Sequence, residues 1–130
     1  MMNAVAERDK VLRLMNMSIL ELRHGYAKVS MPLADSLKNG MGFAHGGTIF
    51  SIADIAFGAA ANEDSEHFVV TLNTSIEYLS PGVTGPLIAE ARLIREGKRI
   101  KNYEVLVYDG QNTLIARAMT TGYATTAIVE

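Results

Sequence analysis

Apolar positions recur with helical spacing in two segments of the chain. Residues 4–16 carry apolar side chains at three-to-four-residue intervals over part of their length, which predicts a short amphipathic helix within residues 1–16. Residues 46–62 are apolar around almost the whole helical circumference, and a helix with that pattern is buried. Because this second helix has only about four to five turns, it cannot span a bilayer, and we expect the protein itself to surround it.

Extended patterns occupy most of the remaining chain. Residues 18–32 fit a bent strand or hairpin that is interrupted at His24-Gly25 and closed by Pro32. Residues 34–44 are rich in loop formers and lead into the buried helix. Beyond residue 66, strand-like patterns separated by turn residues predict four more strands. These strands cover residues 68–79, 87–96, 102–108 and 113–125, with turns at Pro81-Gly82, Gly97-Lys98 and Asp109-Gly110.

The order of these elements predicts an α+β fold. Strands joined by short loops pair antiparallel, because parallel pairing needs long crossovers. An antiparallel sheet that curls around one buried helix satisfies both patterns. No internal repeat, linker or low-complexity stretch divides the 130 residues, and a chain of this length buries about two-thirds of its surface on folding, so we expect one domain over residues 1–130.

Composition and charge exclude several functional classes. The 12 Lys and Arg residues against 14 Asp and Glu give no electrostatic support for general binding to nucleic acid or to an anionic membrane. The absence of cysteine excludes disulfides, thiolate nucleophiles and Cys-ligated metals, and the three histidines lack paired ligand spacing, so no metal is proposed. The charged N-terminus is unlike a signal peptide and no window is apolar enough for a membrane span, which predicts a cytoplasmic protein.

Asp54 is the first candidate for chemistry, because its neighbours from Ile52 to Phe57 are apolar. An unpaired carboxylate in such surroundings costs several kcal/mol, so it needs hydrogen-bond donors, a charged partner or a proton. These conditions suit a general base or a nucleophile. The alternative is a carboxylate that caps a neighbouring loop or lies at an exposed edge of the helix.

The second candidate is the segment Ala44-His45-Gly46-Gly47, where the buried helix starts. The first N–H groups of a helix have no partner within it, and with the helix dipole they suit a carbonyl oxygen that becomes negative during acyl transfer. Asp54 lies about 12 Å further along the axis, so one helix is not expected to supply both halves of one site. A partner subunit or a neighbouring strand would close the gap. The alternative is an ordinary glycine-rich start of a helix.

A third candidate is a cluster of five basic residues around the Gly97-Lys98 turn. Such a cluster suits phosphate groups. The alternative is a solvated hairpin tip, whose positive charge is diluted by neighbouring glutamates. The basic residues are Arg92, Arg95, Lys98, Arg99 and Lys101.

Taken together, Asn39, the segment from Ala44 to Gly47, Asp54 and the segment Tyr78-Leu79-Ser80-Pro81 resemble the motifs of hotdog-fold thioesterases of the phenylacetate-degradation type. The resemblance runs from about residue 39 to residue 125. It implies a long central helix wrapped by a curved antiparallel sheet. It also implies that subunits pair through their sheets, as a dimer or a dimer of dimers, and that the glycines at the helix start of one subunit meet the aspartate of its neighbour.

The same resemblance implies hydrolysis of an acyl-CoA to the free acid and coenzyme A. Asp54 would be the base or nucleophile, and the amide of Gly46 or Gly47 would polarise the thioester carbonyl. No resident cofactor is implied, because coenzyme A is part of the substrate. Residues that would order the loop or the attacking water are Asn39, His45 and Thr71. Residues that would contact the substrate are Tyr78, Ser80, Lys98 and Arg99.

Two other functions are compatible with these residues. A hotdog hydratase or dehydratase would use His45 with Asp54 on an enoyl thioester and would release no thiol. A noncatalytic hotdog module would bind acyl-CoA as a sensor or serve as an assembly subunit. The sequence leaves the acyl group open between aromatic and medium-chain classes, although Ile49, Phe50 and Phe57 are available to line an apolar pocket.

Overall fold

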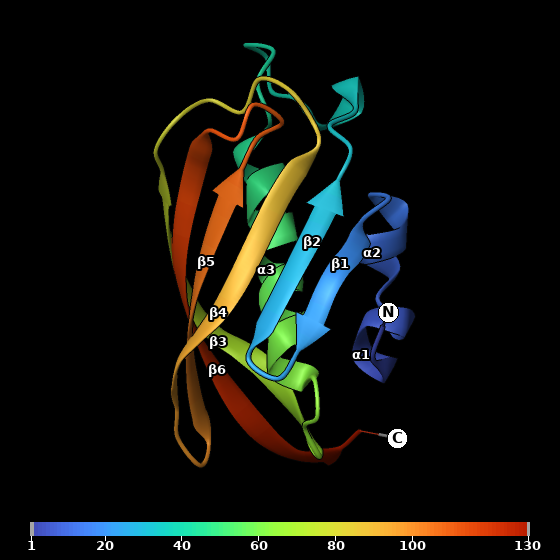
Figure 1. The fold of residues 1–130 in the computed structure, drawn as a ribbon, viewed down its shortest axis with the longest axis vertical. Coiled ribbons are helices and arrows are strands. Elements are labelled where there is room, and N and C mark those ends of the chain that lie inside the picture. Colours follow the sequence, from blue (N-terminus) through green and yellow to red (C-terminus); the bar gives the residue numbers. More distant parts are fainter. Residues whose placement is uncertain (1, 130) are drawn as a thin grey trace.

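The computed structural model describes residues 2–129 and shows a six-stranded antiparallel sheet curved around one long helix (Figure 1). The strands are β1 (Ser18–Arg23), β2 (Tyr26–Met31), β3 (His67–Tyr78), β4 (Leu87–Glu96), β5 (Ile100–Tyr108) and β6 (Leu114–Ile128). The helices are α1 (Ala4–Arg8), α2 (Lys10–Leu14) and α3 (Gly46–Asn62), with a short 3-10 turn at Asp35–Leu37. The predicted α+β class and curved antiparallel sheet are confirmed. Met1 and Glu130, the ends of the predicted domain, lie outside the described residues.

The sheet has the strand order β1-β2-β4-β5-β6-β3, and every neighbouring pair is antiparallel. The predicted strand over residues 87–96 has the observed bounds of β4. The three other predicted strands after the helix differ from the observed ones by at most three residues at either end. The interruption at His24-Gly25 is a hairpin turn, with Gly25 at φ +76°, a conformation that favours glycine. Because β3 is the last strand in the order, one of its edges is free.

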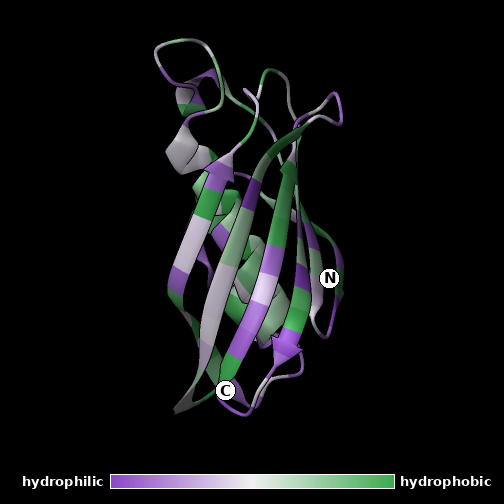
Figure 2. Cartoon of the chain, turned by 90° about the vertical axis from the view of Figure 1, so that its left-hand side faces the viewer, coloured by the Kyte–Doolittle hydropathy of each residue, from purple (hydrophilic) through white to green (hydrophobic). Residues whose placement is uncertain are grey.

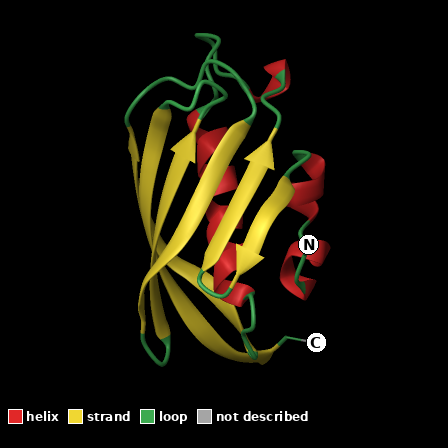
Figure 3. Cartoon of the chain, in the orientation of Figure 1, coloured by secondary structure: helices red, strands yellow, loops and turns green. Residues whose placement is uncertain are grey.

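Helix α3 has the predicted bounds and lies inside the curve of the sheet (Figure 3). The side chains of Ile52, Ala56 and Ala60 are completely buried, and the Phe57 ring meets the Tyr103 ring edge-on at 5.2 Å between centroids. Small residues let the sheet approach the helix closely, since a Cβ atom at Gly122 of β6 would lie 2.6 Å from the Phe57 ring. This packing fixes the position of every side chain that α3 presents to a cavity.

Hydrophobic and hydrophilic residues alternate in bands along the strands (Figure 2). On β5, Tyr103, Val105 and Val107 are buried, whereas the residues between them are half-buried. The alternation is the period-two pattern of a sheet with one face on the core. The inner face therefore forms one core with α3.

The N-terminal segment differs from the prediction of a single helix within residues 1–16. The chain forms two short helices, α1 and α2, which are separated at Asp9. The Asp9 carboxylate accepts a 3.0 Å hydrogen bond from the N–H of Leu12, so Asp9 begins a new helix instead of continuing the first one. Asn3 caps α1 in the same way through the N–H of Ala6. The Asp9 cap thus divides the segment into two helices, each of which begins at its own side-chain cap.

Candidate active site

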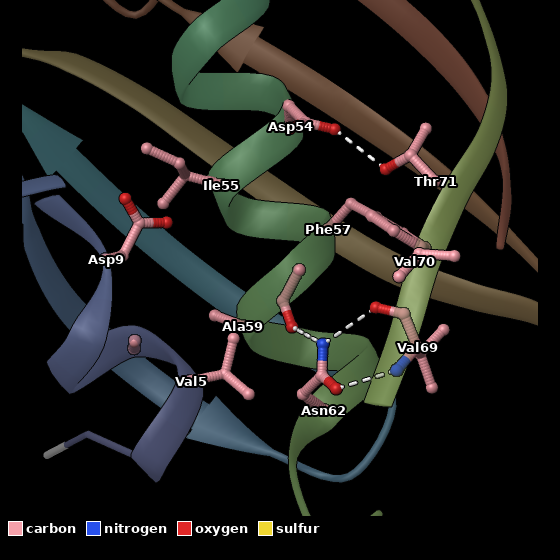
Figure 4. Close-up of a pocket in the computed structure, with 12 residues that line it drawn as sticks. Val5, Asp9, Asp54, Ile55, Phe57, Ala59, Asn62, Val69, Val70 and Thr71 are labelled. Carbon is pink, nitrogen blue, oxygen red and sulfur yellow. Dashed lines mark hydrogen bonds between the residues drawn. The ribbon is translucent and has the colours of Figure 1, made fainter. Parts of the chain in front are cut away.

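Asp54 lies in the middle of α3 and is half-buried. The hydroxyl of Thr71 on β3 donates a 2.9 Å hydrogen bond to its carboxylate (Figure 4). The structure therefore supplies the donor that the apolar neighbours of Asp54 led us to expect. This contact joins α3 to the strand at the free edge of the sheet.

Asn62 holds β3 against the end of α3. Its amide donates to the carbonyl of Val69 at 3.1 Å, and its oxygen accepts from the N–H of the same residue at 2.9 Å (Figure 4). Because Asn62 is 5% exposed, these two hydrogen bonds are shielded from water. They fix the strand two residues before Thr71, and so fix the distance from Thr71 to Asp54.

Two cavities adjoin Asp54, with volumes of about 240 and 230 Å³. Asp9, Asp54 and Ile55 line both of them. The larger cavity lies between α1, α3 and β3, and its wall includes Val5, Phe57 and Thr71. The smaller one adds Val11, Phe50 and Ser51. We call these two cavities the Asp54 pockets.

His45 is the N-cap residue of α3. The Nδ1 atom of His45 accepts a 3.0 Å hydrogen bond from the N–H of Gly47. That contact occupies the Gly47 amide, one of the two alternative candidates for the oxyanion donor that the resemblance implies. The N–H of Gly46 has no acceptor among residues 2–129. Gly46 therefore keeps an amide for a ligand, as expected for the first residue of a helix.

Tyr78, at the end of β3, packs against Gly46. Its hydroxyl donates a 2.9 Å hydrogen bond to the Gly46 carbonyl, and a Cβ atom at Gly46 would lie 3.4 Å from the Tyr78 ring. A cavity of about 420 Å³ opens here, and we call it the helix-start pocket. Its lining includes Asn39, Gly46, Tyr78 and Ser80. Four of the predicted site residues thus share one cavity.

Asn39 orders the loop that precedes α3. Its side-chain oxygen accepts hydrogen bonds from the N–H groups of Met41 at 3.0 Å and Phe43 at 3.1 Å. Its backbone N–H donates to the carbonyl of Phe43 at 2.7 Å, and Gly42 turns the chain at φ +86°. This geometry places Asn39 at the base of the loop and at the wall of the helix-start pocket.

The two groups of predicted catalytic residues lie in separate cavities of one subunit. Asp54 and Thr71 line the Asp54 pockets, whereas Asn39 and Gly46 line the helix-start pocket, and no residue is common to both. The separation follows from the length of helix between Gly46 and Asp54. A single subunit therefore does not assemble the complete constellation.

Lys98 and Arg99 lie away from both groups of catalytic residues. They occupy the β4–β5 turn, at the opposite end of the sheet from the loops around the start of α3 (Figure 1). Both are exposed, and Arg99 donates a 3.2 Å hydrogen bond to the carbonyl of Ala124. Neither residue lines any of the three cavities. Within one subunit, the structure does not bring these two predicted substrate contacts to the site.

Asp9 is the site-lining residue that the sequence analysis missed. In sequence it is one of the charged residues of the predicted amphipathic N-terminal helix, and in the structure it faces the Asp54 pockets from across the cavity (Figure 4). The signal that was available is an aspartate just before the apolar residues Val11 and Leu12, a position typical of an N-cap. Sequence gives no indication that this cap packs beside a residue 45 positions away.

Among residues 2–129, no three His, Asp or Glu side chains gather as metal ligands would. No helix in that part of the chain has the length and apolar character to cross a membrane. The cytoplasmic location inferred from the sequence stays a prediction.

Comparisons with known proteins agree with this fold. The sequence pattern of the thioesterase superfamily matches residues 41–116. The acyl-coenzyme A thioesterase PaaI of Escherichia coli K12 is 31% identical over 115 residues, which are 88% of this chain and 81% of that protein. The solved structure of the E. coli PaaI protein from the phenylacetic acid degradation operon has a TM-score of 0.92 at 27% identity, covering 98% of this chain and 92% of that one. The structure of smu.793 from Streptococcus mutans UA159 bound to acetyl CoA has a TM-score of 0.80 at 30% identity, covering 88% of this chain and 92% of that one.

The chain therefore belongs to the thioesterase superfamily. Within it, the six-stranded sheet and central helix are those of a PaaI-like hotdog thioesterase, so the chain is a thioester hydrolase. The resemblance stated from the sequence motifs is confirmed at the level of family, fold and reaction class.

Proposed function

We propose that this protein hydrolyses acyl-CoA thioesters to a free acid and coenzyme A, with Asp54 as general base or nucleophile. The observation that carries the proposal is the Asp54 carboxylate, which is held by Thr71 at the wall of two cavities in a chain of the thioesterase superfamily. A carboxylate that is positioned by a hydroxyl and open to a cavity can take a proton from a bound water.

The Gly46 amide is the proposed oxyanion donor. His45 already occupies the N–H of Gly47, which leaves the N–H of Gly46 at the positive end of the α3 dipole. The thioester carbonyl accepts this hydrogen bond, which strengthens as the oxygen becomes negative. His45 and Asn39 act by keeping the loop and the helix start in place.

The reaction then needs two transfers. Asp54 takes a proton from water as the water oxygen bonds to the carbonyl carbon, and the tetrahedral intermediate collapses with cleavage of the C–S bond. The coenzyme A thiolate leaves and receives the proton from Asp54. In the nucleophilic variant, Asp54 itself attacks the carbonyl and the resulting anhydride is hydrolysed by water. Thr71 orients the attacking oxygen through its hydrogen bond to Asp54.

The complete site is proposed to form between two subunits. Strand β3 is a free edge, and Val70 and Leu72 on it are 43% and 58% exposed. Pairing of this edge with its copy would continue the sheet across a two-fold axis and cover both side chains. Thr71 lies between them, so the Asp54 pockets border the proposed subunit interface. The assembly is a dimer or a dimer of dimers, with the helix-start pocket of one subunit beside Asp54 of the other.

Coenzyme A binds as part of the substrate in this proposal, with no resident cofactor. Its pantetheine arm lies in the helix-start pocket against Tyr78 and Ser80, which line that cavity. Lys98 and Arg99 contact the nucleotide phosphates of a molecule held mainly by another subunit, because within their own subunit they lie far from the pocket. The acetyl CoA bound to the Streptococcus mutans relative supports the ligand class.

The direct test is thiol release from acetyl-, hexanoyl-, phenylacetyl- and hydroxybenzoyl-CoA by the native protein and by Asp54→Asn. Asp35→Asn is the matched control, because Asp35 is exposed and lines none of the three cavities. We expect the native protein and the control to release thiol and Asp54→Asn to lose at least about 100-fold in kcat. Unchanged release by Asp54→Asn removes Asp54 from the mechanism, and enoyl-CoA hydration without thiol release replaces the proposal with a hydratase.

A further inference from the structure

The α1–α2 segment forms one wall of the Asp54 pockets and brings a second carboxylate to them. Asp9 lines both cavities together with Asp54, and Figure 4 shows its carboxylate directed toward Ile55 on α3. Neither cavity is lined by a Lys, Arg or His residue. The charged side chains of the described lining are therefore two carboxylates without a cation.

The position of Asp9 is fixed at both ends of the segment. The amide of Asn3 donates to the Ala59 carbonyl of α3 at 3.0 Å. Leu12 is 1% exposed and Ala6 is 4% exposed, so both short helices are anchored in the core. Asp9 stands between these anchors, and its own hydrogen bond to the N–H of Leu12 restrains the carboxylate. The Asp9 carboxylate is therefore held in a fixed position in the wall of the Asp54 pockets.

Apart from the polar side chains of Ser51, Asn62 and Thr71, the rest of the lining is apolar, and the cavities are large enough for an acyl group. Val5, Phe57 and Val69 line the larger cavity, and Val11 and Phe50 line the smaller one. A cavity of about 150 Å³ accommodates a benzene ring, so a space of about 240 Å³ has room for an acyl group of about six carbons. The chemistry of the wall therefore favours an uncharged hydrocarbon and opposes an anion.

We propose that Asp9 is a specificity-determining residue, which with Asp54 excludes acyl groups that carry a second carboxylate. The substrate class is then the CoA thioesters of uncharged acyl groups, and dicarboxylic acyl groups are rejected by like-charge repulsion in a partly desolvated site. This inference rests on the proposed function, because it takes the Asp54 pockets as the acyl site.

The test compares hexanoyl-CoA with adipoyl-CoA, which has the same chain length and an added terminal carboxylate. We expect the native protein to prefer hexanoyl-CoA, and Asp9→Asn to raise the kcat/KM of adipoyl-CoA relative to hexanoyl-CoA by about tenfold. Asparagine caps a helix as well as aspartate does, so the variant keeps the fold of α2. Glu7→Gln removes a charge from the exposed side of the same segment and should leave the ratio at its native value.

A binding measurement separates this inference from the proposed function. Dissociation constants for the same two thioesters are measured by calorimetry in the Asp54→Asn protein, with and without Asp9→Asn. A gain of adipoyl-CoA binding relative to hexanoyl-CoA binding on removal of the Asp9 charge supports the inference even if the native protein releases no thiol, a result that would overturn the hydrolysis proposal alone. Ratios that Asp9→Asn leaves unchanged in both measurements overturn the inference.

Discussion

The Thr71 hydroxyl on β3 and the Asp54 carboxylate on α3 are joined by a 2.9 Å hydrogen bond, which connects the central helix to the free edge of the sheet. A change in the position of that edge strand therefore acts directly on the proposed catalytic carboxylate. The bond also explains how a carboxylate is accommodated on a helix whose other side chains are mostly apolar.

Removal of the Thr71 hydroxyl tests this contact. Thr71→Val keeps the shape of the side chain but leaves Asp54 without its donor, and we expect kcat for thiol release to fall about tenfold or more, since hydrogen bonds to charged groups contribute about 1.5–3 kcal/mol. Thr71→Ser restores the hydroxyl and should recover most of the loss. Equal kcat values for the Val and Ser variants would show that the hydroxyl does not assist Asp54.

His45 supports the helix start as a cap in this structure, and two variants distinguish that role from chemistry. His45→Ala removes the acceptor for the Gly47 N–H and is expected to lower the free energy of unfolding by about 1 kcal/mol. His45→Asn supplies another cap acceptor and should recover most of the stability and thiol release lost in His45→Ala. Urea unfolding and thiol release are measured on both. A stable His45→Asn protein with no more activity than His45→Ala would assign the imidazole a chemical role.

Asp109 organises the loops beside the helix-start pocket and makes the stability of the fold depend on pH. The side chain is 3% exposed and accepts hydrogen bonds from the N–H groups of Val83, Gln111 and Thr113. Burial opposes its charge, but the backbone hydrogen bonds, led by that of Thr113, outweigh burial and lower the pKa of Asp109 below its ordinary value. The stability that this carboxylate contributes is present above its unfolded-state pKa and is lost as the pH falls through the lower folded-state pKa.

We expect Asp109→Ala to lower the free energy of unfolding at neutral pH by about 3 kcal/mol, because three backbone donors lose their acceptor. The difference from the native protein should shrink as the pH falls below about 4, the ordinary pKa of an aspartate in the unfolded chain, toward the lower folded-state pKa of Asp109. Urea unfolding from pH 7 down to pH 3 gives both values. A difference independent of pH would show that the charge of Asp109 does not contribute.

His24, which contacts the C-terminal end of α3 at Glu63, should give protein stability the opposite pH dependence. A hydrogen bond to the Glu63 backbone, and then contacts with Glu96 at 3.0–3.1 Å, raise the pKa of His24 above its ordinary value. Stability from a raised pKa is fully present below about pH 6.5 and is lost as the pH rises through the folded-state value. The melting temperature of the native protein should therefore exceed that of His24→Gln at pH 5.5 by more than at pH 8.5. An equal difference at both pH values would contradict the ion pair.

The sequence was sufficient to predict the parts of the structure that depend on local pattern. The all-round apolar residues 46–62 predicted the buried helix with its observed bounds, and the turn residues at 97–98 separated β4 from β5 correctly. The division of the N-terminal helix at Asp9 was missed because a capping side chain and an exposed charge look alike in a one-dimensional pattern.

The candidate site was predictable as residue types but not as a spatial arrangement. Asp54, Gly46 and Tyr78 stood out by chemistry or by motif, whereas the contact from Thr71 to Asp54 depends on the packing of β3 against α3. The approach of Asp9 to the Asp54 pockets is a tertiary contact for which no local signal exists. Whether Lys98 reaches a ligand depends on the assembly of subunits, which lies beyond any single-chain pattern.

The central claim is that Asp54 and Gly46 from different subunits form one hydrolytic site, and complementation between two inactive variants tests it most directly. Asp54→Asn lacks the base, and Gly46→Val blocks the oxyanion donor with a side chain against the Tyr78 ring. Co-expression with two affinity tags yields mixed dimers, in which one site would carry both defects and the other neither. The account predicts that the mixed dimer releases thiol from hexanoyl-CoA at about half the native rate per dimer, while both parent proteins stay inactive. A mixed dimer as inactive as its parents would contradict a site shared between subunits.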